Sequence, residues 1–216
     1  MQLRADELAT AQRAFNARGS KVVRCEGCLL PTVNCMCASK PTPAGQCAVA
    51  FIMYKGEYYK PTNTGRLIAD VIADNHAFLW HRTMPCEPLL ALLNNPLYQP
   101  IIVFPHEYAS EERCIHQPVA APNKKLLFIF LDGTWREARK MFGKSPYLDS
   151  LPVLGVSPDI ASNYLLRAST HEFQHCTAEV GISVLDLAGE TESARNLAQY
   201  FSVFRHQYLK GNDNCH

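Results

Sequence analysis

The sequence predicts an α/β fold in which helices cover both faces of a mostly parallel sheet. Apolar stretches of strand length alternate along the chain with segments of helical periodicity. Two of these stretches, residues 47–54 and 126–131, contain no charged residue. Continuous apolar strands are typical of parallel sheets, because helices bury both faces of such a sheet.

The elements of the main domain follow from this periodicity and from the positions of glycine and proline. We predict strands at residues 47–54, 77–80, 101–104, 126–131 and 152–156. We predict helices at residues 66–73, 87–93, 135–142, 177–187 and 192–208. Nearer the N-terminus, an amphipathic helix is expected at residues 5–18, with arginines on its outer faces. Hydration alone or contact with RNA phosphates explains that basic surface.

Composition limits the organisation of the chain. Its 216 residues, 47% of them hydrophobic, suffice for one main domain with a single core. We expect an N-terminal segment at residues 1–40, the main domain at 41–210 and a tail at 211–216. The formal charge is only +1, so any contact with nucleic acid must use local basic patches.

Two further expectations concern location and assembly. No stretch approaches the roughly 18 apolar residues of a membrane span, and the N-terminus has no apolar signal core. A cytoplasmic protein without membrane contact is therefore expected. Monomer and homo-oligomer are equally compatible with the sequence.

The turn after the central strand is the best candidate for a functional site. Thr134 and Glu137 form a capping-box pattern, which predicts a helix that begins at Trp135. In open α/β sheets, ligands bind at the carboxyl ends of the strands, near the free N–H groups of helices. Capping explains Thr134 and Glu137, and a turn explains Gly133. Neither explains Asp132 or Trp135, so these two residues are the functional candidates.

Four of the nine cysteines lie within residues 25–37. The spacing Cys25-x-x-Cys28 and Cys35-x-Cys37 can supply four thiolates to one tetrahedral zinc ion. A site with four protein ligands has no open position for catalysis, so a structural role is expected. Reactive thiols or an iron–sulfur cluster are the alternatives.

Cationic side chains cluster on the helix that follows the central strand. Arg136, Arg139, Lys140 and Lys144 recur at spacings that place them on one side of that helix. Together with Arg66 near another helix start, they can hold a polyanion over the Asp132 turn. The alternative is a hydrated face on which Glu137 and Lys140 pair.

A second motif points to a different chemistry. His171-Glu-Phe-Gln-His175 matches the HExxH pattern of zinc metalloproteases, with Glu192 or His206 as a possible third ligand. The metzincin extension is absent, because Ala178 stands where its glycine would be. The sequence contains no glycine-rich dinucleotide loop and no Walker A loop.

Several motifs in order resemble the DTW-domain family. The resemblance rests on the cysteine pattern, Asp132-Gly-Thr-Trp135 with the following Arg-Glu-Ala-Arg-Lys-Met, and the motifs Asn63-Thr-Gly-Arg-Leu67, Phe104-Pro105, Lys144-Ser-Pro-Tyr-Leu148 and Thr177-Ala-Glu179. It implies a SPOUT-like, knotted fold in which the C-terminal segment builds the cofactor pocket. It also implies transfer of the 3-amino-3-carboxypropyl group of S-adenosylmethionine to N3 of a tRNA uridine, with 5′-methylthioadenosine as the leaving group. A non-catalytic RNA-binding protein with a zinc knuckle is the other function class.

The resemblance and the strand ends together suggest roles for particular residues. Asp132 and Trp135 are the expected catalytic residues, with Asp132 accepting the N3 proton or binding the cofactor's amino group. The cofactor is expected among Phe104, Pro105, Leu131, Asp132, Gly133, Thr134, Val156, Tyr164, Leu166, Thr177 and Glu179. The tRNA is expected to contact Asn63, Thr64, Arg66, Arg136, Arg139 and Lys140. Tyr54-Lys-Gly-Glu57 departs from the His-Pro-x-Glu stretch of many relatives, which weakens any role assigned to it.

Overall fold

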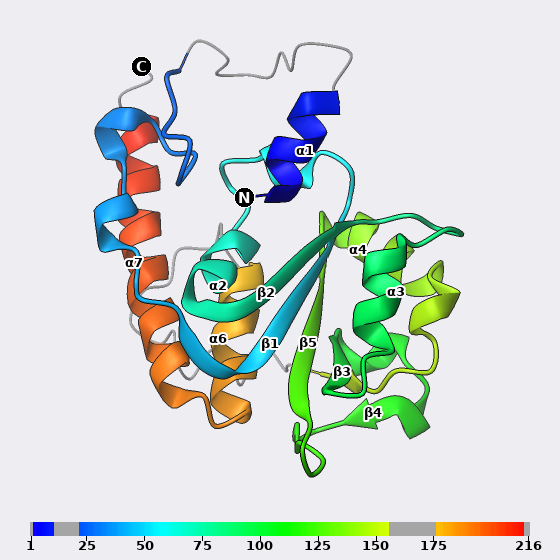
Figure 1. Ribbon diagram of the computed structural model, residues 1–216. Helices are drawn as coiled ribbons and strands as arrows, with labels where there is room; N and C mark the ends of the chain where they lie inside the picture. Colours follow the sequence, from blue (N-terminus) through cyan, green and yellow to red (C-terminus); the bar gives the residue numbers. More distant parts are fainter. Residues whose placement is uncertain (1, 11–21, 156–175, 214–216) are drawn as a thin grey trace.

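A parallel sheet forms the centre of the molecule (Figure 1). The computed structural model describes residues 2–10, 22–155 and 176–213. Within them the strands are β1 (Ala44–Met53), β2 (Ile72–Leu79), β3 (Tyr98–Val103), β4 (Cys114–Ile115), β5 (Lys125–Asp132) and β6 (Val153–Leu154). They lie in the order β2-β1-β5-β3-β6-β4, and every paired neighbour is parallel. This confirms the predicted α/β class with a parallel sheet.

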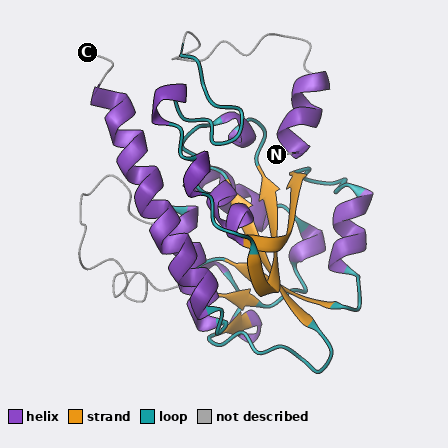
Figure 2. Cartoon of the chain, turned by 60° about the vertical axis from the view of Figure 1, so that its left-hand side comes forward, coloured by secondary structure: helices purple, strands orange, loops and turns teal. Residues whose placement is uncertain are grey.

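Helices cover both faces of the sheet (Figure 2). The described helices are α1 (Gln2–Thr10), α2 (Gly65–Val71), α3 (Glu87–Leu93), α4 (Trp135–Gly143), α6 (Thr177–Leu187) and α7 (Thr191–Asp213). Phe128 and the residues two positions before and after it in β5 pack with α2, α6 and α7 in one apolar cluster. Leu127 and Ile129 pack with α3 and α4 in the other cluster. The alternation follows from the strand period, which turns successive side chains to opposite faces.

Several boundaries differ from the prediction, and the one between α2 and β2 changes the assignment of residues 72–76. Helix α2 ends at Val71 and β2 begins at Ile72, although a helix to residue 73 and a strand from residue 77 were expected. The Asn75 side-chain N–H₂ donates to the carbonyls of Ala69 and Ile72, at 3.1 and 2.8 Å, which satisfies acceptors at the helix end. The two-residue strand β4 was not predicted, because so short a segment shows no periodicity. Of the helix expected at residues 5–18, the described part is α1.

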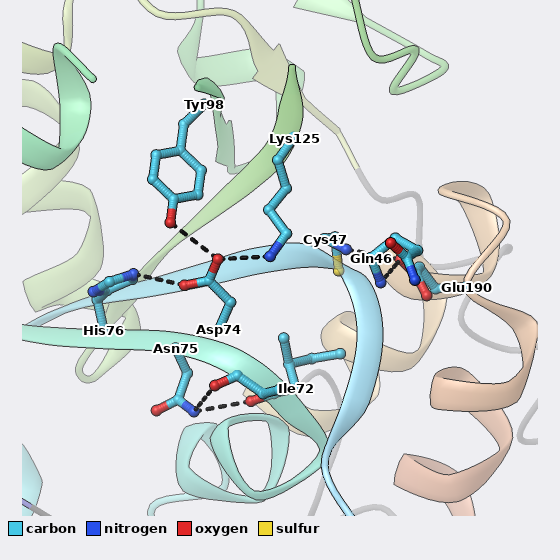
Figure 3. Close-up of polar contacts among 10 residues, drawn as sticks. Gln46, Cys47, Ile72, Asp74, Asn75, His76, Tyr98, Lys125 and Glu190 are labelled. Atoms are coloured by element: carbon cyan, nitrogen blue, oxygen red, sulfur yellow. Dashed lines mark hydrogen bonds and ion pairs between the residues drawn. The ribbon is translucent and has the colours of Figure 1, made fainter. Parts of the chain in front are cut away.

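The amino edge of the sheet is held by a polar network around Asp74 (Figure 3). Its carboxylate receives Lys125 Nζ at 2.6 Å, the Tyr98 hydroxyl at 3.0 Å and His76 Nε2 at 3.0 Å. These partners come from β5, β3 and β2, so one carboxylate ties three strands together. Nearby, Glu190 accepts from the backbone N–H groups of Gln46 and Cys47, which fastens β1 to the start of α7.

Within the described residues, no helix has both the length and the apolar composition needed to cross a bilayer.

Candidate active site at the carboxyl edge of the sheet

Asp132 is the last residue of β5 and lies at the opposite edge of the sheet from Asp74. It is 3% exposed. Asn63 Nδ2 donates to Asp132 Oδ2 at 2.7 Å, and the Thr177 hydroxyl donates to Oδ1 at 3.4 Å. Both partners are neutral and come from segments far away in the sequence, one before α2 and one at the start of α6. Within the described residues, the carboxylate is therefore fixed in position without a direct ion pair.

The environment of Asp132 makes its carboxyl group easier to protonate than that of an ordinary aspartate. Burial is the main cause and raises the pKa of the Asp132 carboxyl to about 6, with the negative charge of Glu57 adding to the effect. Hydrogen bonds from Asn63 and Thr177 and the charge of Lys60 act in the opposite direction. Asn63 Nδ2 also donates to Glu57 Oε1 at 3.3 Å, so one amide links two buried carboxyl groups. Lys60 forms an ion pair with the other oxygen of Glu57.

Two glycines leave the space that this arrangement needs. A Cβ on Gly65 would lie 2.8 Å from Asp132 Oδ2 and 3.2 Å from the Phe51 ring. A Cβ on Gly133 would come within 3.1 Å of Glu137 and 3.2 Å of Tyr54. The glycine of the Asn-Thr-Gly motif thus allows the first turn of α2 to approach the carboxylate closely.

The predicted capping box at α4 is confirmed. Glu137 N–H donates to Thr134 Oγ1 at 3.4 Å, and Glu137 Oε2 accepts from the Thr134 N–H at 2.8 Å and from its hydroxyl at 2.6 Å. Glu179 caps α6 in a similar way by accepting from the Cys176 N–H at 3.0 Å. Capping thus occupies Glu137 and Glu179.

Trp135 stands at the edge of an aromatic cluster. Its side chain is 52% exposed. Its ring is nearly parallel to that of Phe104, with centroids 5.5 Å apart, and meets Tyr108 edge-on at 5.6 Å. Phe104 in turn stacks on Phe142 at 4.4 Å. The aromatic residue of the Phe-Pro motif after β3 and that of the Asp132 turn therefore belong to one stacked cluster.

The expected tRNA contacts divide into two groups. Arg136, Arg139 and Lys140 are exposed on α4, and no carboxylate of the described chain pairs with them. The Glu137–Lys140 ion pair is absent from the described residues, because capping holds Glu137.

The side chains of the second group form hydrogen bonds inside the protein. Asn63 and Thr64 are buried, and Thr64 Oγ1 accepts from the Ala178 N–H at 3.2 Å. The Arg66 guanidinium donates to the carbonyls of Cys28 and Pro61 and lies 5.3 Å from the centroid of the Phe204 ring.

The structure gathers many, but not all, of the predicted cofactor residues. Phe104, Asp132, Gly133 and Thr177 lie at the carboxyl edge of the sheet or beside it, and Pro105 and Leu131 are their immediate neighbours in the chain. Val156, Tyr164 and Leu166 lie outside the described residues, as does the His171 to His175 motif.

The four clustered cysteines form a second candidate site. Their sulfur atoms all lie within 4.8 Å of one another, and three pairs are separated by 3.4, 3.5 and 3.8 Å. A tetrahedral zinc with bonds of about 2.3 Å requires sulfur atoms about 3.8 Å apart, so the cluster fits such an ion. A Cβ on Gly27 would lie 2.8 Å from Cys37 Sγ, which explains the glycine between the first two cysteines. The cluster could therefore hold a metal ion such as zinc.

Comparison with known families agrees with this geometry. The DTW domain matches residues 22–209, which include the cysteine cluster, the Asp132 turn and α6. The chain belongs to the DTW-domain family. No solved structure matches the chain. Membership of the DTW family is consistent with a tRNA-modifying enzyme. The buried acid at the end of β5 is compatible with such a role.

Sequence reasoning missed two parts of the site. Glu57 was assigned no role, although it is buried and shares the Asn63 amide with Asp132. The glutamate of the His-Pro-x-Glu stretch in relatives was the available signal. Tyr54 and Trp80 were also missed, because no local pattern places the ends of β1 and β2 beside α4. Lys140 Nζ lies 5.6 and 5.5 Å from the centroids of their two rings.

Proposed function

We propose that this protein transfers the 3-amino-3-carboxypropyl group of S-adenosylmethionine to N3 of a uridine in tRNA. The observation that carries the proposal is the Asp132 carboxyl, buried at the end of β5 with its pKa raised to about 6, in a chain of the DTW-domain family. A base with a pKa close to the working pH is suited to proton transfer. An ordinary aspartate near 3.9 is a weak base for this step.

Asp132 would accept the N3 proton as the nitrogen attacks. The new bond joins N3 to the aminocarboxypropyl carbon, the bond from that carbon to sulfur breaks, and its electron pair stays on sulfur in 5′-methylthioadenosine. The sulfonium supplies the leaving group, so the protein needs no nucleophile of its own. Its tasks are to orient the aminocarboxypropyl carbon toward N3 in preference to the methyl group, and to receive the proton.

A second role for Asp132 is binding the amino group of the cofactor's methionine moiety. The Asn63 and Thr177 hydrogen bonds would fix the carboxylate for either role. The two roles differ in what the Asp132→Asn variant loses. Loss of cofactor binding supports the second role, whereas slow transfer with normal binding supports the first.

We propose that the cofactor lies against the carboxyl edge of the sheet. Phe104 would supply an apolar contact and Thr177 a hydroxyl group. Gly133, which has no side chain, would let the backbone approach the cofactor closely. Pro105, Leu131, Thr134 and Glu179 are the expected neighbours. The SPOUT-like knot implied by the family, and the contributions of Val156, Tyr164 and Leu166, belong to this proposal.

We propose that Trp135 borders the reacting groups and that Arg136, Arg139 and Lys140 hold tRNA phosphates. Their charges are not neutralised by described carboxylates, which is the condition for releasing counterions on binding. The internal hydrogen bonds of Asn63, Thr64 and Arg66 suit them to support the site from within. Their direct contact with tRNA stays a prediction.

We propose that the cysteine cluster binds one structural zinc ion. Four sulfur ligands complete the coordination shell, and metal binding would stabilise a segment whose cysteines are mostly solvent-accessible. Arg66 links this segment to α2 through the Cys28 carbonyl. Protein purified without chelator should contain one zinc per chain. Cys28→Ala should lose the metal and unfold at a lower temperature, whereas unchanged metal content and stability would refute the assignment.

The two alternative functions make different predictions. A non-catalytic RNA-binding protein does not require a buried Asp132 with a raised pKa. A metalloprotease would need the His171 to His175 motif, which lies outside the described residues. Replacing both histidines by alanine should leave the metal content unchanged if the cysteines hold the zinc.

The direct test is mass spectrometry of tRNA nucleosides after incubation of the protein with S-adenosylmethionine and tRNA. The proposal predicts aminocarboxypropyl-uridine and 5′-methylthioadenosine in equal amounts. Methylated nucleosides, or no modified nucleoside with correctly folded protein, would contradict it.

A further inference from the structure

The outer face of α4 carries cations that rest on aromatic rings. Arg139 lies over the Tyr108 ring at 5.0 Å, and Lys140 lies over the rings of Tyr54 and Trp80. The Lys140 ammonium also donates to the Tyr54 hydroxyl at 3.3 Å. In the described part of the chain, neither side chain forms an ion pair. Both cations can therefore turn toward an external anion without breaking a salt bridge.

The rings form two pairs, one on each flank of this helix face. On one flank Trp135 meets Tyr108 edge-on, with centroids 5.6 Å apart. On the other flank Tyr54 and Trp80 are nearly parallel, at 5.5 Å and 21°. Trp135 is more than half exposed, and Tyr54, Trp80 and Tyr108 are partly exposed. The Trp80 N–H donates to Ser145 Oγ at 2.8 Å, which fixes that ring against the end of α4.

We propose that this face binds a single-stranded RNA loop, with bases stacked on the two aromatic pairs and phosphates held by Arg139 and Lys140. The inference deepens the proposed function and rests on it for the identity of the RNA. Cations alone would suit any nucleic acid, but rings can stack only on bases that are not already enclosed in a helix. The combination of cations and available rings therefore selects single strands over duplexes.

The reaction chemistry points in the same direction. N3 lies on the Watson–Crick edge of uridine, and its proton is engaged in any standard base pair. Transfer to N3 therefore requires an unpaired base. Other enzymes that do chemistry on a base have the same requirement. The Tyr54 N–H donates to the Asp132 carbonyl at 2.8 Å, so one aromatic pair is joined directly to the strand that carries the proposed base. Bases next to the target uridine can then stack within reach of the site.

The chain offers a direct probe, because Trp80 and Trp135 are its only two tryptophans. Trp135→Phe leaves Trp80 as the sole tryptophan, and Trp80→Phe leaves Trp135. Each variant is titrated with a single-stranded oligoribonucleotide of about ten nucleotides and with a duplex of equal phosphate number. Single strands should quench both tryptophans and duplexes neither. No quenching of either tryptophan by the single strand, or equal quenching by the duplex, would overturn the inference.

Affinity measurements separate stacking from charge. Trp80→Leu should weaken binding of the single strand about tenfold and leave the salt dependence unchanged. Lys140→Gln should instead reduce the slope of log K against log salt by about 0.7. Trp80→Phe is the matched control, since it also loses the hydrogen bond to Ser145 but keeps an aromatic ring. Equal weakening in Trp80→Phe and Trp80→Leu would refute the stacking role.

Binding is measured here without S-adenosylmethionine and without transfer, so the two proposals can fail separately. A protein that selects single strands but modifies no uridine would retain this inference and refute the proposed function. A protein that modifies tRNA but binds duplexes equally well would do the reverse. Equal quenching by an acidic peptide of matched charge would also overturn the inference, by indicating a protein partner.

Discussion

Asp74 and Asp132 lie at opposite edges of the same sheet and have opposite electrostatic surroundings. Asp74 receives Lys125, Tyr98 and His76, and its side chain is 24% exposed. Asp132 receives two neutral donors and is almost completely buried beside the charge of Glu57. In the part of the chain that the structure describes, one carboxylate is compensated by a direct cation and the other is not.

The direction of each pKa shift follows from this difference. Burial by itself would raise the pKa of Asp74, but the hydrogen bonds from Lys125 and Tyr98 hold it below its ordinary value. Burial raises the pKa of Asp132 to about 6, because Asn63 and Thr177 compensate only part of the desolvation. The amino edge of the sheet thus has an acid suited to holding strands together. The carboxyl edge has an acid suited to exchanging a proton.

The largest predicted effect on stability is a gain in the Asp132→Asn variant at alkaline pH. The folded protein holds the Asp132 proton up to about pH 6, whereas an unfolded aspartate loses it near 3.8. The folded state therefore binds more protons between these values, and the free energy of unfolding falls as pH rises through them. Asparagine removes this loss, so the variant should gain up to about 3 kcal/mol at pH 8.

Urea unfolding at pH 8 and pH 4 measures this effect. The gain should be present at pH 8 and nearly absent at pH 4, where the wild-type carboxyl is protonated in the folded protein. A variant less stable than the wild type at both pH values would show that Asp132 is a compensated structural acid like Asp74.

The Asp74→Asn variant should show the opposite sign and a smaller magnitude. It removes a charged acceptor from Lys125, Tyr98 and His76, and hydrogen bonds to charged groups contribute about 1.5–3 kcal/mol. Because the edge is partly exposed, we expect a loss of about 1–2 kcal/mol at pH 7. The pKa of Asp74 is lowered in the folded state, so this loss should disappear as the wild type is acidified through that pKa. Urea unfolding at pH 7 and at progressively lower pH tests it, and a loss that stays the same at every pH would contradict the electrostatic explanation.

The smallest effect concerns the neighbours of Asp132. Glu57→Gln keeps an oxygen for the Asn63 amide but removes a negative charge, so the pKa of Asp132 should fall. Lys60→Met removes the positive charge, so the pKa should rise. Each change should be below about 1.4 kcal/mol, or less than one pH unit in the titration midpoint. Carbon NMR of the Asp132 carboxyl measures both, and shifts of the same sign would refute the assigned electrostatics.

Local patterns predicted the parts of the structure that local physics determines. The apolar run before Asp132 predicted β5, and the Thr134 and Glu137 spacing predicted the start of α4 at Trp135. The cysteine spacing predicted a cluster that could bind metal. Each of these features depends on residues a few positions apart.

The rest of the site depends on contacts between distant segments. Asn63 meets Asp132 across 69 residues, and Lys140 meets Tyr54 across 86. No periodicity or spacing encodes such pairs, which arise from the strand order of the sheet. The contacts of Arg66 inside the protein were not predicted for the same reason, because its partners belong to the segment with the four cysteines and to α7.

The most direct test of the account is a comparison of wild-type protein and Asp132→Asn in the transfer reaction, with cofactor binding measured in parallel. Asparagine keeps the size and one hydrogen-bonding oxygen while it removes the charge. If Asp132 is the general base, the variant should bind S-adenosylmethionine normally and transfer to tRNA uridine should be at least about 100-fold slower, given the usual contribution of such a group. Near-normal transfer by a correctly folded Asp132→Asn protein would contradict that role.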